Sequence, residues 1–365
     1  MSDADRRVYE SIVSPDLSDE QRERIVTPAR VYDGQRAVLA VHWHPEFVPM
    51  ELIRERIARM FPNRQRELII PTQHNVLMEY DGYAGTEVDC YSHGFNLKVQ
   101  LLIHFEKSRV AGADVFRSML AHTFRYRQKQ LFEFIDSVVD PEWRGRLATA
   151  AVRTRADNEL VEFVAAETLK LKRLLVECES VTPPDAIRNK LLSSFVLVQT
   201  SRWDERRVAE ALALLGEVKR IVKETFSTEF FYATEEVIEE VRGLGGGIVV
   251  PHPEQFWPIL LAEYDVDGYE VWNPQSRQYT EFLIHVVSRQ NKTRRRGRRP
   301  LLIFMGDDCH VGEKAKEPRF QEADKAGREI GVQPAWDDLA IRKGLIVAGA
   351  DRRSVIEDYR SRLGS

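Results

Sequence analysis

The stretch Arg36-Ala37-Val38-Leu39-Ala40-Val41-His42-Trp43-His44 joins an apolar run to a pair of histidines. Its composition predicts a buried strand over residues 36–44. Residues two apart in a strand face the same way, so both imidazoles are expected on one side and Trp43 on the other. Such a pair suits a borderline metal ion such as zinc, manganese or iron. Because a His-x-His pair also arises by chance or in packing, the metal interpretation requires ligand residues at the ends of other strands.

The composition excludes few functions. The chain has 365 residues, of which 43% are hydrophobic and 30% charged, enough for one large domain or two smaller ones. A formal net charge of −4 does not demand nucleic acid or an acidic surface as a partner. No apolar run is long enough for a membrane span, and the polar N-terminus has no signal-peptide pattern. Three cysteines without a CxxC motif predict reduced thiols in a cytoplasmic protein.

Predicted strands and helices alternate in the first and last parts of the chain. Strands are expected over residues 36–44, 67–74, 86–89, 98–105, 245–250, 268–273, 301–305 and 344–348, and helices over 50–61, 276–290 and 352–363. This alternation is typical of an α/β fold.

The middle of the chain, residues 112–242, has a different pattern and is expected to be almost entirely helical. An apolar stripe at helical spacing is formed by Val208, Ala211, Leu212, Leu215, Val218 and Val222. We therefore expect residues 1–111 and 243–365 to form two parts of one α/β domain, with 112–242 as an all-helical insertion and a helix at the C-terminus.

Histidine and carboxylate residues recur at the predicted strand ends. They are His42, His44, His74, Glu87, His104, His252, Glu270 with Asn273, and Asp308 with His310. In a barrel of parallel strands, the C-terminal strand ends meet on one face. So many ligands exceed the needs of one tetrahedral metal ion and favour two or three ions. Such ions hold both oxygens of a phosphoryl displacement, and metal-bound hydroxide is then the expected nucleophile.

The order of these motifs resembles the PHP (polymerase and histidinol phosphatase) family of metal-dependent phosphoesterases. The similarity covers residues 36–105 and 244–312. It lies in His42-Trp43-His44, Gln73-His74-Asn75, Gly85-Thr86-Glu87-Val88, Leu102-Ile103-His104, Val250-Pro251-His252-Pro253, Gly268-Tyr269-Glu270-Val271 with Asn273, and Gly306-Asp307-Asp308-Cys309-His310.

The resemblance implies a distorted (β/α)7 barrel and two or three divalent ions, zinc, manganese or iron. The implied metal ligands are His42, His44, His74, Glu87, His104, His252, Asp308 and His310. Two departures stand out. Pro45-Glu46-Phe47 occupies the place where the family has a further histidine, so Glu46 replaces that ligand or one metal is weak or missing. Gln73 stands where the family has aspartate.

Other charged residues offer weaker signals. The run Lys292-Thr293-Arg294-Arg295-Arg296-Gly297-Arg298-Arg299 follows a predicted helix and precedes a strand, which places it on the face opposite the metals and favours a solvated turn over a nucleic-acid contact. Arg277, and Lys314 or Lys316, follow strands and are better placed to bind substrate phosphate.

The favoured function is that of a phosphoester hydrolase. Its substrate is a nucleotide, an oligonucleotide end or a phosphorylated metabolite, and His252 and Asp308 are the expected catalytic residues, with His252 or a neighbouring histidine protonating the leaving oxygen. One alternative is a catalytically reduced metal-binding scaffold whose helical block binds a partner. Another is a hydrolase of the amidohydrolase type, which gives no reason for Asp308-Cys309-His310.

Overall fold

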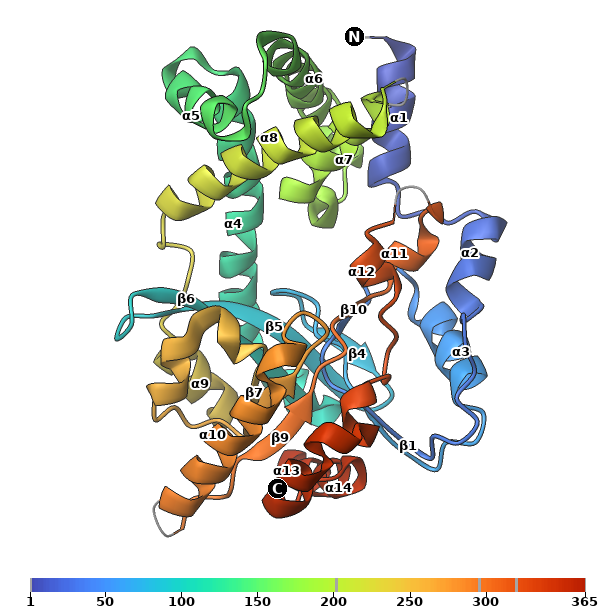
Figure 1. Ribbon diagram of the computed structural model, residues 1–365, viewed down its shortest axis with the longest axis vertical. Coiled ribbons are helices and arrows are strands. Elements are labelled where there is room, and N and C mark those ends of the chain that lie inside the picture. The colour runs from blue at the N-terminus through green and yellow to red at the C-terminus, as the bar shows by residue number, and fades with distance from the viewer. Residues whose placement is uncertain (1, 201–202, 295–296, 319–320, 365) are drawn as a thin grey trace. The chain divides into compact units, whose positions relative to one another are not determined.

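The computed structural model describes residues 2–200, 203–294, 297–318 and 321–364. The chain divides into two compact units (Figure 1). The helical unit comprises residues 1–16 and 124–230, and the sheet unit comprises residues 17–123 and 231–365. Helix α4 (Asp114–Val139) contributes residues to both.

The helical unit has a hydrophobic core of its own. Besides the second part of α4, its helices are α1 (Asp3–Val13), α5 (Arg144–Thr154), α6 (Asn158–Glu177), α7 (Asn189–Gln199) and α8 (Glu205–Thr225), with the 3-10 turns η2 (Pro141–Trp143), η3 (Glu179–Val181) and η4 (Pro184–Ala186). Asp157 caps α6 and Asp204 caps α8 through backbone N–H groups. Tyr9 of α1 is buried in this core, and its hydroxyl lies 2.7 Å from Thr182 Oγ1. The first residues of the chain therefore complete a unit formed mainly by residues far along the sequence.

The sheet unit is built around six hydrogen-bonded strands. In spatial order these are β4 (Met78–Tyr80), β5 (Tyr83–Ser92), β6 (Leu97–Glu106), β7 (Gly247–Val250), β8 (Gly268–Trp272) and β9 (Leu302–Met305). Pairs from β4 to β7 are antiparallel, and β7, β8 and β9 are parallel. Two further parallel pairs join β1 (Ala37–Ala40) to β3 (Arg66–Ile69) and β2 (Trp43–His44) to β10 (Cys309–His310).

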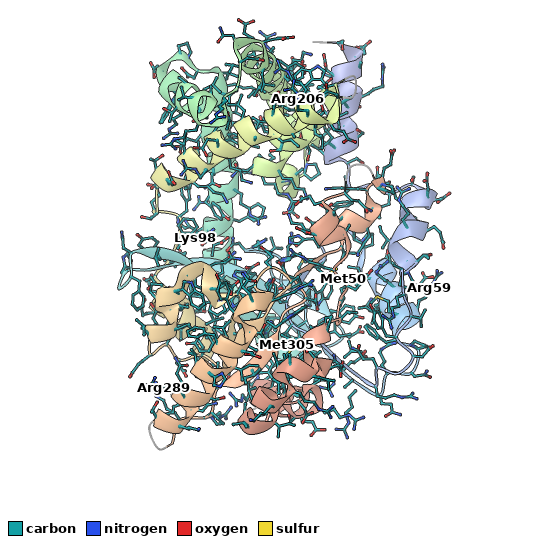
Figure 2. All side chains as sticks on the ribbon, in the orientation of Figure 1. Met50, Arg59, Lys98, Arg206, Arg289 and Met305 are labelled. Carbon is teal, nitrogen blue, oxygen red and sulfur yellow. The ribbon has the colours of Figure 1, made fainter. Side chains whose placement is uncertain are left out.

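Helices cover the strands of this unit. They are α2 (Asp19–Val26), α3 (Met50–Met60), α9 (Thr234–Gly243), α10 (Thr280–Thr293), α11 (Gly312–Ala315), α12 (Ala323–Ala326), α13 (Leu339–Ala348) and α14 (Arg352–Leu363), with the 3-10 segments η1 (Lys107–Gly112), η5 (Pro253–Leu261), η6 (Arg277–Tyr279) and η8 (Pro334–Asp337). Helix α9 contacts β7, α10 contacts β8, and α14 contacts β1, β3 and β9 (Figure 1). Strands β1 and β7 are buried at every residue, as expected for strands covered on both faces. Met305 of β9 lies inside, whereas Arg59 of α3 is exposed (Figure 2).

The structure is mixed α/β with a central sheet, as the sequence predicts. The described strands do not close into a hydrogen-bonded ring, since β4 and β9 form the two ends of the six-stranded sheet. The strand predicted over residues 344–348 is wrong: this segment belongs to helix α13, which Asp338 caps and Gly349 ends in a left-handed conformation. Within the described residues, no helix combines the length and apolarity needed to cross a membrane.

A buried ion pair ties α3 to the segment that follows α12. Arg56, 2% exposed, donates to Glu329 through Nε at 2.9 Å and to the carbonyl oxygens of Ile25 and Thr27 at 2.6 and 3.1 Å. These bonds satisfy a guanidinium that burial would otherwise leave without water.

We expect Arg56→Met to lower the free energy of unfolding by about 1–3 kcal/mol, because Glu329 keeps only Lys314 as a partner and the carbonyl oxygens of Ile25 and Thr27 lose their donor. Arg54→Met, two residues away on α3, is the matched control: its ion pair with Asp81 is exposed and contributes about 1 kcal/mol or less. Urea unfolding of both variants measures the difference. Equal midpoints for the two variants would show that the Arg56 pair is not a stabilising contact.

Candidate metal centre

The His-x-His pair follows directly from the first buried strand. Strand β1 ends at Ala40, and His42 and His44 flank Trp43 at β2. The two imidazole centroids lie 5.4 Å apart, while Trp43 packs against Tyr80 in a separate hydrophobic cluster. Both histidines are buried to 1% exposure. The side chains thus divide between two faces, as their alternation along the strand predicts.

Two buried carboxylates meet these histidines from different parts of the sheet unit. Glu87 lies in the middle of β5, and its Oε2 is 2.8 Å from His74 Nδ1 and 3.5 Å from His44 Nε2. Asp308 follows β9, and its Oδ1 is 3.4 Å from His44 Nε2 and 3.6 Å from His42 Nε2. The β2–β10 pairing, which sets His310 beside His44, holds the second carboxylate against the first histidine pair.

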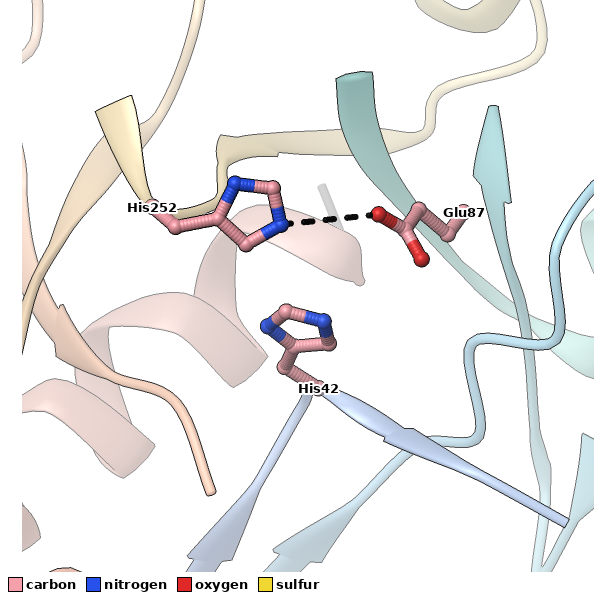
Figure 3. Close-up of side chains that lie close together, drawn as sticks. All are labelled: His42, Glu87 and His252. Atoms are coloured by element: carbon pink, nitrogen blue, oxygen red, sulfur yellow. Dashed lines mark ion pairs between the residues drawn. The ribbon is translucent and has the colours of Figure 1, made fainter. Parts of the chain in front are cut away.

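Among the residues that the structure describes, three groups of side chains have ligand atoms close enough to hold a metal ion. They are His42–Glu87–His252, His42–His44–Asp308 and His44–His74–Glu87, each with its ligand atoms within 4.8 Å of one another. Figure 3 shows the first group, in which His252 Nε2 lies 3.8 Å from Glu87 Oε1. Because His42, His44 and Glu87 each belong to two groups, the three groups form one continuous cluster.

Buried donor atoms without hydrogen bonds support the fit of this donor set to a cation. Glu87 Oε2 and His74 Nδ1 form an ion pair at 2.8 Å, but neither atom makes a hydrogen bond among the described residues. The same holds for Nδ1 of His44 and of His252. Buried polar atoms without partners are rare and costly, and imidazole nitrogen with carboxylate oxygen is a donor set that divalent first-row metals accept.

The electrostatics of the cluster also favour anionic carboxylates. Burial acts to raise the pKa of Glu87, but the adjacent His74, His252 and His44 outweigh it and hold that pKa well below its usual value. The pKa of Asp308 is lowered well below its usual value in the same way, by His310, His44 and His42 against the effect of burial. Burial and the neighbouring His310 and His74 lower the pKa of His44 to about 3, which keeps its nitrogens available as ligands.

Glu270 of β8 orients two of the histidines. Its Oε1 lies 2.7 Å from His42 Nδ1, and its Oε2 accepts a hydrogen bond from the backbone N–H of His252 at 3.0 Å. The carboxylate rests against the Cα of Gly306, where any Cβ would collide with it. A carboxylate on the far nitrogen of a metal-binding histidine fixes its tautomer and ring orientation.

Hydrogen bonds to Oδ2 fix the orientation of the Asp308 carboxylate. Gln275 Nε2 donates to Asp308 Oδ2 at 2.8 Å, and the buried Arg328 donates to the same oxygen and to the Asp308 carbonyl. Oδ1 is thereby left to face the histidines. The segment that carries Arg328 is fixed in turn by Lys314, whose Nζ donates to Arg328 O at 2.7 Å.

Left-handed backbone conformations accompany this cluster. Glu46, His252 and Asp308 have φ values of 56°, 26° and 46°, and Asn75, next to His74, has a φ of 53°. Non-glycine residues rarely adopt these values, and each costs about 1–3 kcal/mol that the surrounding structure must offset. Such strain is characteristic of sites where side-chain placement matters more than local stability.

The structure brings together most of the metal ligands predicted from the sequence. His42, His44, His74, Glu87, His252 and Asp308 form the three groups. His310 lies beside them, with Nε2 3.4 Å from Asp308 Oδ1 and Nδ1 3.6 Å from Glu46 Oε1. Glu46 thus contacts the cluster where the expected third histidine is missing.

His104 is not brought to the cluster. Its Nδ1 lies 2.7 Å from the hydroxyl of Tyr359 and its Nε2 lies 2.9 Å from Val41 O, so both nitrogens already have partners. Strand β6 runs antiparallel to β7 and sets His104 opposite Gly247, whereas His252 follows the other end of β7. The expectation that His104 ends a parallel strand on the metal face is therefore corrected.

The two predicted substrate-binding residues have different surroundings. The Lys314 ammonium is buried and bonded to the carbonyl oxygens of Ala326 and Arg328 and to Glu329, so it supports the fold instead of facing a ligand. Arg277 is exposed after β8, with its guanidinium carbon 5.9 Å from the centre of the Trp272 ring.

Sequence reasoning missed the residues that position the ligands. Glu270 was visible as a carboxylate near the end of a predicted strand, but its role as the partner of His42 depends on tertiary contact. Arg328 carries no sequence signal, since it lies in an irregular segment after α12.

Comparison with solved structures gives a structural similarity. No protein-family model matches the chain, and no curated protein matches it. The crystal structure of a protein from Bifidobacterium adolescentis, provisionally assigned as a metal-dependent phosphoesterase, is similar at 17% identity and a TM-score of 0.42, covering 88% of this chain and 97% of that one. A match at this level does not assign a function, which depends on the residues of the centre themselves.

We expect His42→Ala to lower the metal content of the purified protein, because His42 belongs to two of the three groups. His285→Ala is the control, since His285 is exposed on α10. Elemental analysis of both variants measures ions per chain. Unchanged metal content in His42→Ala would contradict the assignment of the centre.

Gly306→Ala tests the support that Glu270 provides. The new Cβ displaces the Glu270 carboxylate from His42, so metal affinity is expected to fall about 10–100-fold. Gly344→Ala is the matched control, because its Cβ meets Ile284 Cγ2 at 3.4 Å, an ordinary contact. Titration with zinc and a competing chelator measures both variants. Wild-type affinity in Gly306→Ala would show that Glu270 does not orient His42.

Proposed function

We propose that this chain is a metal-dependent phosphoesterase of the PHP type, acting on a nucleotide, an oligonucleotide end or a phosphorylated metabolite. The observation that carries the proposal is the sharing of His42, His44 and Glu87 among three ligand groups. Sharing of this kind suits two or three closely spaced ions, for which zinc, manganese and iron are the candidates. The order of the ligand motifs along the chain supports the PHP assignment and its barrel-like arrangement of strands.

The residues that would hold the ions are His42, His44, His74, Glu87, His252 and Asp308, with His310 and Glu46 beside them. When bound, such ions would activate a water molecule and offset the negative charge of the substrate phosphate. The chain itself orients the donors: Glu270 fixes His42, and Arg328 with Gln275 fixes Asp308. This prior placement lowers the reorganisation needed during reaction.

A proton donor for the leaving oxygen is also available. His252 is the proposed donor, and His310, which lies beside His44, is the second candidate. Burial acts to lower the pKa of each of these histidines, but adjacent carboxylates, Glu87 for His252 and Asp308 and Glu46 for His310, raise it above the usual value. Because a metal-bound imidazole is neutral, the donor would be whichever of these two histidines does not bind an ion, and there the raised pKa favours the protonated ring that a general acid requires. Arg277 is proposed to contact the substrate phosphate from the loop after β8.

The proposed compartment is the cytoplasm. Cys90, Cys178 and Cys309 are all buried as free thiols, which suits a reducing environment.

Hydrolysis of an aryl phosphate by metal-loaded protein tests the function. We expect Asp308→Asn to lower kcat/KM about 100-fold or more, because the carboxylate that faces His42, His44 and His310 loses its charge. Asp81→Asn is the matched control: Asp81 also has a left-handed backbone, with φ 41°, but lies in an exposed turn. Asparagine tolerates this conformation at both positions.

Wild-type protein that retains its metal ions but hydrolyses neither an aryl phosphate monoester nor an aryl phosphodiester would overturn the proposal. Equal activity in Asp308→Asn and Asp81→Asn would place the reaction elsewhere.

A further inference from the structure

A second polar site lies at the opposite ends of the parallel strands from the metal centre. His252 and Asp308 follow the C-terminal ends of β7 and β9. At the N-terminal ends is a pocket of about 350 Å³, lined by residues just before β8 and β9, by the last turn of α9 and by the end of α14. Its cationic residues are Arg242, Arg294, Arg298, Arg299 and Arg362.

The inner wall of this pocket is built from neutralised arginines. Arg242 contacts Asp265 at 3.0 Å and Asp267 at 2.8 Å. Arg362, 5% exposed in its side chain, contacts Asp358 at 3.0 Å and Asp267 at 3.3 Å. Because Asp267 also accepts the backbone N–H of Ile248 at 2.9 Å, these pairs are anchored to β7. These ion pairs fix the position of the inner wall and occupy the carboxylates of Asp265, Asp267 and Asp358.

The outer wall carries positive charge that is not balanced in this way. Arg294 and Arg298 belong to the basic run predicted as a solvated turn, of which Arg295 and Arg296 lie outside the described residues. Within the described part of the chain, no ion pair joins Arg294 or Arg298 to a carboxylate, and the buried Nε of Arg294 has no hydrogen-bond partner. Burial, together with repulsion by Arg298, lowers the pKa of Arg294. Within the described residues, Arg294 and Arg298 therefore bring positive charge to the pocket that no ion pair offsets.

We propose that this pocket binds a small phosphate-bearing anion, of the size and charge of pyrophosphate, independently of the metal centre. Guanidinium groups bind phosphate oxygens through paired N–H donors, and an anion would neutralise the excess charge of Arg294 and Arg298. The pocket is large enough to admit a small anion from solvent. A chain with net charge −4 and a basic run limited to one turn offers no extended track for a nucleic-acid backbone.

Calorimetric titration with methylenebisphosphonate, a pyrophosphate analogue that resists hydrolysis, tests the site. We expect the wild-type protein to bind, and Arg294→Gln combined with Arg298→Gln to weaken binding at least about tenfold, because two charge-assisted contacts are lost. Arg289→Gln is the matched control, since Arg289 is exposed on α10 outside this pocket (Figure 2). It should bind as the wild type does.

The metal centre could also bind a bisphosphonate, so His42→Ala is titrated in parallel. Binding retained in His42→Ala and lost in the arginine variant supports the second site, whether or not the protein hydrolyses phosphoesters. Binding lost in His42→Ala but retained in the arginine variant overturns it. Absence of binding in the wild type also overturns it. A single-stranded oligonucleotide of twenty nucleotides is titrated as well. If it binds more tightly than the bisphosphonate and depends on the same arginines, the small-anion proposal is overturned and nucleic acid is the ligand.

Discussion

The arrangement of the centre depends on two carboxylates buried from water, Glu87 and Asp308, whose negative charges must be stabilised by neighbouring groups. They are 1% and 5% exposed, and a buried anion is costly unless cations or hydrogen-bond donors surround it. Five histidines from four separate segments supply that surrounding, and Arg328 and Gln275 complete it for Asp308. The strained backbones of His252 and Asp308 follow from the same condition, because the side chains are placed at the expense of local geometry.

What could be foreseen from the sequence is what local chemistry encodes. The apolar run that precedes His42 predicts a buried strand. Because Trp43 separates the two histidines, both imidazoles are predicted on one face, and the structure has this arrangement. His104 was misplaced because alternation along a strand does not encode the strand's direction in the sheet. Antiparallel pairing of β6 with β7 reverses the end at which His104 lies.

Supporting residues were harder to foresee than ligands. A lysine after a metal-binding strand looks like a phosphate contact in sequence, yet Lys314 is used to hold the backbone of Arg328. The segment 345–348 shows the same limit in secondary structure. Its apolar residues predict a strand, but Leu345 is buried and Ile346 and Val347 are exposed, the pattern of the last turn of helix α13.

The long helical block does not prevent His252 from reaching the centre. Strands β6 and β7 are hydrogen-bonded neighbours, so the residues between them form a long insertion whose two ends lie side by side in the sheet. The entropic cost of closing such a loop grows slowly, by about 0.6 kcal/mol for each doubling of its length. Helix α9 packs on β7 within this insertion, and the helical unit has a core of its own. His252 is therefore positioned by the β6–β7 ladder, and the distance in sequence from His104 carries little penalty.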